Sequence, residues 1–191
     1  IALTVRGGWP VLAFGAAGMT VGFLYNAGPL PISSTPAGEL FAGGFLGEVL
    51  ILVTVYVQTG ALTRESLLMG IPSTLLIASI LTVNNTCDMK GDRSAGRHTL
   101  SLLVGKPAAV IIILLFGAAA YGFTVRFSLG NTPLLPDTVL YAALPAAAYS
   151  MFEYIRMLKR GFSHDTKGKN MGSIIRIFGV FTAAVVFGLL A

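Results

Sequence analysis

The side chains with the clearest chemical potential lie in one polar segment, residues 84–107, between two apolar runs. If the helix before this segment continues past Val83, then Asn84, Asp88 and Asp92 stand at positions i, i+4 and i+8 and share one helix face. A stripe of amide and carboxylate oxygens suits a hard cation such as Mg²⁺, which takes its remaining ligands from water and phosphate. We therefore interpret Asp88 and Asp92 as catalytic metal ligands, with Asn84 as a third ligand.

Basic side chains surround this stripe of oxygen ligands. Lys90, Arg93 and Arg97 supply ammonium and guanidinium groups, which bind phosphate oxygens, and Asn84 can either ligate a metal or hydrogen-bond a phosphate. Carboxylates for a metal beside cations for an anion predict a site for a Mg²⁺–diphosphate. The alternative is a solvated loop between helices, whose charges only solubilise it and fix the topology of the chain.

The rest of the chain is compatible with lipid. Of its 191 residues, 54% are hydrophobic and 11% are charged, whereas soluble domains carry about 25% charged residues. The composition predicts an all-α integral membrane protein that is surrounded by membrane lipid. The formal net charge of +5 is interpreted as a topology signal, and no nucleic-acid partner is expected.

Six apolar segments are long enough to cross a bilayer, which takes about 20 residues each. They predict a single membrane domain over residues 1–191, with spans near residues 8–25, 39–59, 66–84, 103–125, 138–156 and 171–190. Nine of the 13 basic residues fall in, or at the edges of, the two loops that follow the third and fifth spans, on one side of the membrane. The positive-inside rule makes that side cytoplasmic. We therefore expect a multi-pass protein of the plasma membrane, with its Asp-bearing loop in the cytoplasm and both termini of this chain outside.

Two features outside the polar segment leave alternatives open. Tyr25 and Asn26 begin an uncharged, proline-containing loop on the predicted cytoplasmic side, which serves as either a substrate rim or a plain connector. In the second span, Gly43 and Gly47 have the spacing that permits close helix packing. Glu48 follows them roughly in mid-membrane, as either a protonated hydrogen-bonding group between helices or a pocket residue.

The run Asn84–Leu100 resembles the second aspartate-rich motif of the UbiA superfamily of intramembrane prenyltransferases. The superfamily pattern there is Asp-x-x-x-Asp, often preceded by Asn and followed by Gly, a basic residue and Thr-Leu. Upstream, residues 25–29, 38–41 and 56–60 are similar to the 1,4-dihydroxy-2-naphthoate prenyltransferase branch, which makes demethylmenaquinone. The resemblance covers essentially the whole chain.

This resemblance implies a ring of nine transmembrane helices around a central cavity, with one aspartate-rich motif after the second helix and another after the sixth. Only three predicted spans precede the motif here, and the sequence holds no other paired acidic cluster. The chain is therefore expected to correspond to the last six helices of such a ring, with the first three helices and the first motif lying before Ile1.

The activity implied by the resemblance is Mg²⁺-dependent transfer of a polyprenyl group from a polyprenyl diphosphate to an aromatic acceptor. The expected acceptor is 1,4-dihydroxy-2-naphthoate, with 4-hydroxybenzoate as the alternative, and Tyr25 and Asn26 are candidate acceptor-binding residues.

Three other classes of protein compete with this interpretation. A CDP-alcohol phosphotransferase requires an Asp-Gly-x-x-Ala-Arg run, whereas Arg93 follows Asp92 here. A transporter would explain Glu48 but leaves the aspartates without a role, and a non-catalytic membrane scaffold would explain the single motif.

Overall fold

A computed structural model of the chain describes residue 5 and residues 7–129 and 133–191, and the regular structure of these residues is helical throughout. The first half comprises α2 (Trp9–Asn26), the 3₁₀ turn η1 (Ile32–Ser34), α3 (Gly38–Gly43), the π-helical segment η2 (Gly44–Val49), α4 (Leu50–Thr59) and α5 (Arg64–Met69). The second half comprises α6 (Ile71–Ser94), α7 (Leu100–Val104), α8 (Lys106–Ser128), α9 (Asp137–Arg160), the 3₁₀ turn η3 (His164–Thr166) and α10 (Lys167–Leu190).

Among the described residues, four helical stretches are long and apolar enough to cross a membrane, namely Gly38–Thr59, Arg64–Ser94, Lys106–Ser128 and His164–Leu190. The prediction of an all-helical integral membrane protein is thus confirmed. The first and fifth predicted spans are also helices, α2 and α9, but they are not among these four. Helix α2 has only 18 residues and ends in Tyr25 and Asn26, while α9 carries Asp137, Glu153 and Arg156.

The helix ends do not coincide with the ends of the predicted spans, because hydropathy marks where apolar residues stop rather than where a helix stops. The third span was expected to end near residue 84, and α6 continues for ten more residues to Ser94. The fourth span was expected to begin at residue 103. Instead, α7 ends at Val104, and Gly105, whose φ of +81° is left-handed, separates it from α8.

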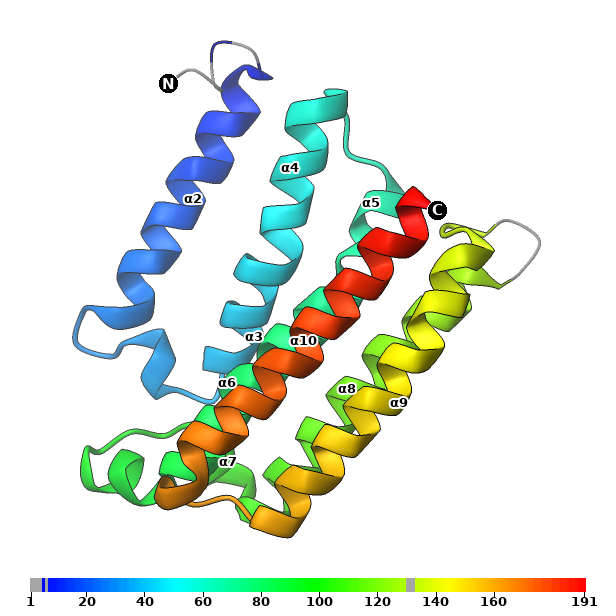
Figure 1. The fold of residues 1–191 in the computed structure, drawn as a ribbon. Coiled ribbons are helices and arrows are strands. Elements are labelled where there is room, and N and C mark those ends of the chain that lie inside the picture. Colours follow the sequence, from blue (N-terminus) through cyan, green and yellow to red (C-terminus); the bar gives the residue numbers. More distant parts are fainter. Residues whose placement is uncertain (1–4, 6, 130–132) are drawn as a thin grey trace.

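The long helices run alternately up and down, so three connections meet at one end of the bundle (Figure 1). These are the α2–α3 loop with η1, the α6–α8 segment with α7, and the α9–α10 turn with η3, all at the bottom of the view. Helix α6 is central and packs against α3, η2, α8 and α10, while α10 also packs along α9. The main buried cluster accordingly joins α6, α8, α9 and α10 and includes Leu76, Ile113, Met157, Ile174 and Ile177.

The predicted close packing at Gly43 and Gly47 is confirmed. A Cβ atom added to Gly47 would lie 2.5 Å from the Thr74 Cα of α6, and one added to Gly43 would lie 2.6 Å from the Thr74 carbonyl oxygen. The two glycines therefore let the backbones of α3–η2 and α6 approach closely. Glu48, in the π-helical segment, also faces this contact, with its carboxylate against Gly70.

Candidate functional site

Helix α6 carries the predicted oxygen ligands beyond the apolar part of the bundle. Because α6 is continuous from Ile71 to Ser94, Asn84, Asp88 and Asp92 lie one turn apart on one side of it. The sequence predicted this shared face on the condition that the helix continues past Val83, and it does. The stripe lies in the last three turns of α6, the part of this helix that reaches the end of the bundle where the three connections meet (Figure 1).

Asp92 is buried, at 5% exposure, and holds two connections together. Its Oδ1 accepts a hydrogen bond from Arg97 Nη1 at 2.7 Å, and the same guanidinium donates through Nη2 to the Ser33 carbonyl oxygen at 2.6 Å. The backbone N–H of His98 donates to the Ser34 carbonyl oxygen at 2.7 Å. The segment after α6 is thus bound to η1, and Arg97 is already engaged with the carboxylate rather than free for an anion.

Asp88 is paired with an imidazole and an ammonium group from the far end of the chain. Its Oδ1 lies 2.9 Å from His164 Nδ1, and its Oδ2 forms an ion pair with Lys167. His164 belongs to η3 and Lys167 begins α10, so the α9–α10 turn closes over the aspartate stripe. The sequence analysis did not include either residue in the site. The only available signal was the basic α9–α10 loop, which topology had placed on the same side as Asp88.

The other predicted anion ligands, Lys90, Arg93 and Asn84, differ in their exposure and in their position relative to the stripe. Lys90 and Arg93 are exposed, and helix geometry puts Lys90 about 200° around α6 from Asp88. The structure therefore does not bring Lys90 together with the stripe. Asn84 is half-buried, and its Nδ2 donates to Asn85 Oδ1 at 3.2 Å.

A buried glutamate in α3 joins the site and was missed by the sequence analysis. Glu39 is 2% exposed, and its Oε1 accepts a hydrogen bond from Asn85 Nδ2 at 2.9 Å. Its Oε2 and the Oδ2 of Asp92 are both buried without a hydrogen-bond partner among the described residues. A carboxylate in the first turn of an apolar span was the signal, but spacing along the sequence did not link it to a residue 46 positions away.

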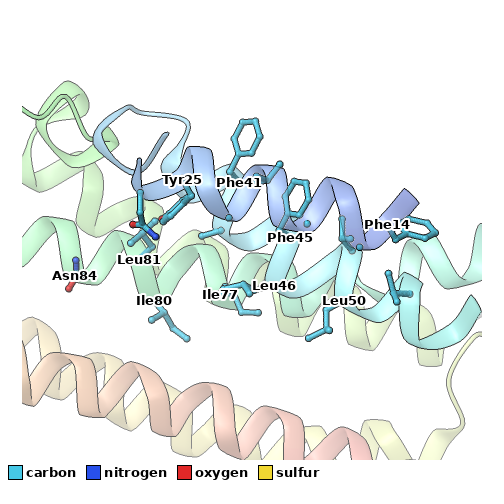
Figure 2. Close-up of a pocket in the computed structure, with 18 of the residues that line it drawn as sticks. Phe14, Tyr25, Phe41, Phe45, Leu46, Leu50, Ile77, Ile80, Leu81 and Asn84 are labelled. Carbon is cyan, nitrogen blue, oxygen red and sulfur yellow. The ribbon is translucent and has the colours of Figure 1, made fainter. Parts of the chain in front are cut away.

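A cavity of about 830 Å³ opens beside the stripe, between α2, the α3–η2–α4 helix and α6, with Met171 of α10 also lining it. Figure 2 shows Tyr25 and Asn84 at one end of this cavity, and Phe14 and Leu50 at the other. Its walls between these ends are mainly apolar. Asn26 lines it as well, so the structure brings both predicted acceptor-binding residues to the same cavity as Asn84.

The donor set of the stripe fits Mg²⁺. Carboxylate and amide oxygens are the ligands that this ion prefers, and the buried Asp92 Oδ2 has an unused acceptor position. No three His, Cys, Asp or Glu side chains gather closely enough to hold a metal by themselves within residues 7–129 and 133–191. Mg²⁺ does not require such a cage, since it is usually held by one or two carboxylates together with water and substrate phosphates.

The fold and the site define a class: a helical membrane protein in which a stripe of oxygen ligands continues from Asn84, at one end of a mainly apolar cavity, to the paired charges of Asp88 and Asp92. The sequence profile described as "UbiA prenyltransferase family" matches residues 1–174. The chain belongs to the UbiA prenyltransferase family.

Several named relatives are similar to this chain. It is 39% identical over 117 residues to the 1,4-dihydroxy-2-naphthoate octaprenyltransferase of Bacillus subtilis (strain 168), a match that covers 61% of this chain and 38% of that protein. UbiA prenyltransferase domain-containing protein 1 of Xenopus tropicalis is 32% identical over 126 residues, covering 62% of this chain and 35% of the relative. The Homo sapiens protein of the same name is 33% identical over 95 residues, or 50% and 28%.

The chain therefore spans well under half the length of the relatives it matches. No solved structure matches the chain.

Proposed function

We propose that this chain is part of a Mg²⁺-dependent intramembrane prenyltransferase, which transfers a polyprenyl group from a polyprenyl diphosphate to an aromatic acceptor. The observation that carries the proposal is the course of α6. This helix presents Asn84 to an apolar cavity and carries Asp88 and Asp92 one and two turns further toward the polar end of the bundle. Membership of the UbiA prenyltransferase family supports the same reaction class.

In this proposal Asp88, Asp92 and Asn84 would hold Mg²⁺, which would supply positive charge to neutralise the diphosphate and stabilise it as a leaving group. Arg93, Arg97 and Lys90 are the candidates from the sequence for contacting diphosphate oxygens, although Arg97 is bound to Asp92 and Lys90 lies on another face of α6 than Asp88.

His164 and Lys167 join that set of anion contacts because they lie against Asp88. Arg97 has a second role in the proposal, since it ties Asp92 to the Ser33 carbonyl oxygen and so keeps the α2–α3 loop over the site.

The cavity serves the hydrocarbon part of the substrate. The prenyl tail lies along its apolar walls, and the walls exclude water that would quench an allylic cation. The bond between the prenyl C1 and the diphosphate oxygen breaks, and a bond forms between C1 and a ring carbon of the acceptor. With 1,4-dihydroxy-2-naphthoate, the ring carboxylate leaves as CO₂, which gives the demethylmenaquinone skeleton. Tyr25 and Asn26 are our candidates for positioning the acceptor ring.

The same proposal covers architecture and location. We infer that all six predicted segments span the membrane, α2 and α9 included, and that residues 1–191 belong to one membrane domain. They would supply the last six helices of a nine-helix ring in the plasma membrane, with the aspartate stripe facing the cytoplasm. The match to the naphthoate prenyltransferase of B. subtilis supports this branch of the family.

The test uses the intact gene product in nanodiscs, with a polyprenyl diphosphate and either 1,4-dihydroxy-2-naphthoate or 4-hydroxybenzoate, in Mg²⁺ or EDTA. Product is read by mass. We expect prenylated naphthoate with loss of CO₂ in Mg²⁺ and none in EDTA. Turnover of 4-hydroxybenzoate alone would keep the mechanism and overturn the acceptor, whereas no product from either would favour a transporter or a non-catalytic scaffold.

A further inference from the structure

Two arginines pair with one carboxylate where α9 and α10 lie side by side, and a third arginine is linked to them through Ser173. Arg176 donates to both oxygens of Glu153, with Nη2–Oε2 at 3.0 Å and Nε–Oε1 at 3.3 Å, and Arg156 Nη1 donates to Oε1 at 3.2 Å. Arg160 Nη2 lies 2.5 Å from Ser173 Oγ, which also accepts from Arg176 at 3.3 Å. This arginine cluster, Arg156, Arg160 and Arg176, therefore carries an excess of positive charge over Glu153.

Two of these guanidinium groups are fixed in place and still accessible. Glu153 is 1% exposed, whereas Arg156 and Arg176 are 50% and 47% exposed. A guanidinium has five N–H donors, so the bonds to Glu153 leave donors free on each. The ring of Phe152, 5.4 Å from the Arg156 guanidinium carbon, further restrains that side chain. Such pre-organised donors suit an anion with several oxygens, such as a phosphate.

An apolar groove of about 680 Å³ lies between the same two helices. Small side chains, among them Ala142 and Ala146 of α9 and Ala183 of α10, leave space between the helices for it. Tyr149 also lines the groove, and its hydroxyl donates to Glu153 Oε1 at 3.3 Å. The groove therefore begins next to the arginine cluster and extends along the apolar part of the bundle.

The arrangement matches a lipid in depth as well as in charge. Arg156 lies one turn from the end of α9 at Arg160, on the polar side of the bundle where η3 connects α9 to α10. Arginines at such a level keep their charged heads at the membrane interface. An acyl chain in the groove would then run from this interface into the membrane, in the direction that Figure 1 shows for α9 and α10.

We propose that the arginine cluster and the α9–α10 groove form a binding site for an anionic phospholipid, distinct from the prenyltransferase site. The headgroup phosphate lies on Arg156 and Arg176, and one acyl chain fills the groove. An apolar helix covering the same face would bury two half-exposed guanidinium groups with a single carboxylate between them, which is costly in a membrane. The charge balance therefore favours an anionic lipid over a protein partner. The lipid-site proposal does not depend on the prenyl-transfer reaction proposed above.

The first test maps bound lipid on the unaltered protein. The intact gene product is placed in phosphatidylcholine nanodiscs that contain phosphatidylglycerol with a photoactivatable acyl chain, and crosslinked peptides are identified by mass spectrometry. We expect crosslinks concentrated on residues 138–149 and 180–187, displaced by unlabelled phosphatidylglycerol at lower concentrations than by phosphatidylcholine. Crosslinks spread evenly over all lipid-facing helices, or absent from the groove because protein covers it, would overturn the proposal.

The second test separates headgroup from chain. Arg156→Gln should reduce the preference for phosphatidylglycerol about fivefold, the contribution expected of one basic residue at an anionic surface. Arg176 still pairs with both oxygens of Glu153 in this variant. Arg126→Gln is the matched control, because it makes the same charge change at the end of α8, where the only side-chain hydrogen bond of the guanidinium within the described residues is to the Leu129 carbonyl oxygen. An equal loss in both variants would overturn the headgroup assignment.

Ala183→Leu should weaken crosslinking of both lipids, because the larger side chain fills the groove. Val186→Leu, at an exposed position of α10 outside the groove, should not weaken it. No difference between these two variants would exclude the groove as the acyl-chain site.

Discussion

At the scale of single residues, Asp88 is the sharpest test of the proposed metal site. Asp88→Asn keeps the shape of the side chain but removes the charge that a Mg²⁺ ligand needs, so we expect prenyl transfer to be abolished. Asp165→Asn makes the same change at an exposed position of the neighbouring turn η3 and should leave the rate near that of the wild type. A near-wild-type rate of Asp88→Asn in saturating Mg²⁺ would contradict the assignment.

Arg97 provides a residue-scale test of the loop contact that does not depend on activity. Arg97→Gln leaves the buried Asp92 carboxylate without its cation and removes the bond to the Ser33 carbonyl oxygen. We expect a loss of about 1–3 kcal/mol in the free energy of unfolding, read as a lower midpoint of thermal unfolding in detergent. Arg93→Gln, at an exposed position, should change it by less than about 0.5 kcal/mol. Equal midpoints for the two variants would show that the contact adds nothing.

The sequence predicted the site residues that lie on a single helix, α6, and missed the site residues that other elements of the fold contribute. Asn84, Asp88 and Asp92 share a helix face because of their spacing alone. Glu39, His164 and Lys167 reach the same region from α3, η3 and α10, through contacts between residues 46, 76 and 79 positions apart. Only tertiary packing sets such contacts. The same packing engages Arg97 with Asp92, which its positive charge alone did not predict.

At the scale of the helices, the contact between η2 and α6 makes a testable prediction at Gly47. A Cβ atom there would collide with the Thr74 backbone, which cannot move aside as a side-chain end can, so Gly47→Ala should separate the two helices. We expect a loss of a few kcal/mol, the range for overpacking a buried contact. Gly44→Ala is the matched control, since nothing lies within 4 Å of its added Cβ, and it should be neutral or slightly stabilising. Thermal unfolding of both variants in one detergent would decide the matter, and equal midpoints would contradict the close approach.

The sequence predicted this contact because the prediction required only two glycines, Gly43 and Gly47, on one helix face. The ends of the helices were harder to predict. The polar last turns of α6 stay helical although they lie beyond the apolar run, partly because Asp88 and Asp92 find cationic partners there. Hydropathy depends only on the composition of a segment, so it cannot include ion pairs with residues from other segments.

At the scale of the whole molecule, the up-and-down order of the helices determines which connections lie on the same side of the membrane. The distribution of basic residues predicts which of the two sides is cytoplasmic. The α6–α7 segment and the α9–α10 turn lie at one end, and the α4–α5 connection lies at the other (Figure 1). The positive-inside rule places the first end in the cytoplasm. Cysteines at the exposed positions Ala95 and Ala61 report on the two ends, and the buried native Cys87 gives little background.

In intact cells, we expect a membrane-impermeant maleimide to label Ala61→Cys, and to label Ala95→Cys only after permeabilisation. The reverse pattern would place the aspartate stripe outside the cell, where a diphosphate made in the cytoplasm could not reach it, and would overturn the proposed function together with the topology. Labelling of both positions in intact cells would instead show that the α5–α6 stretch, the span between them, does not cross the membrane. The proposed reaction therefore depends on the orientation of the bundle as much as on the chemistry of Asp88 and Asp92.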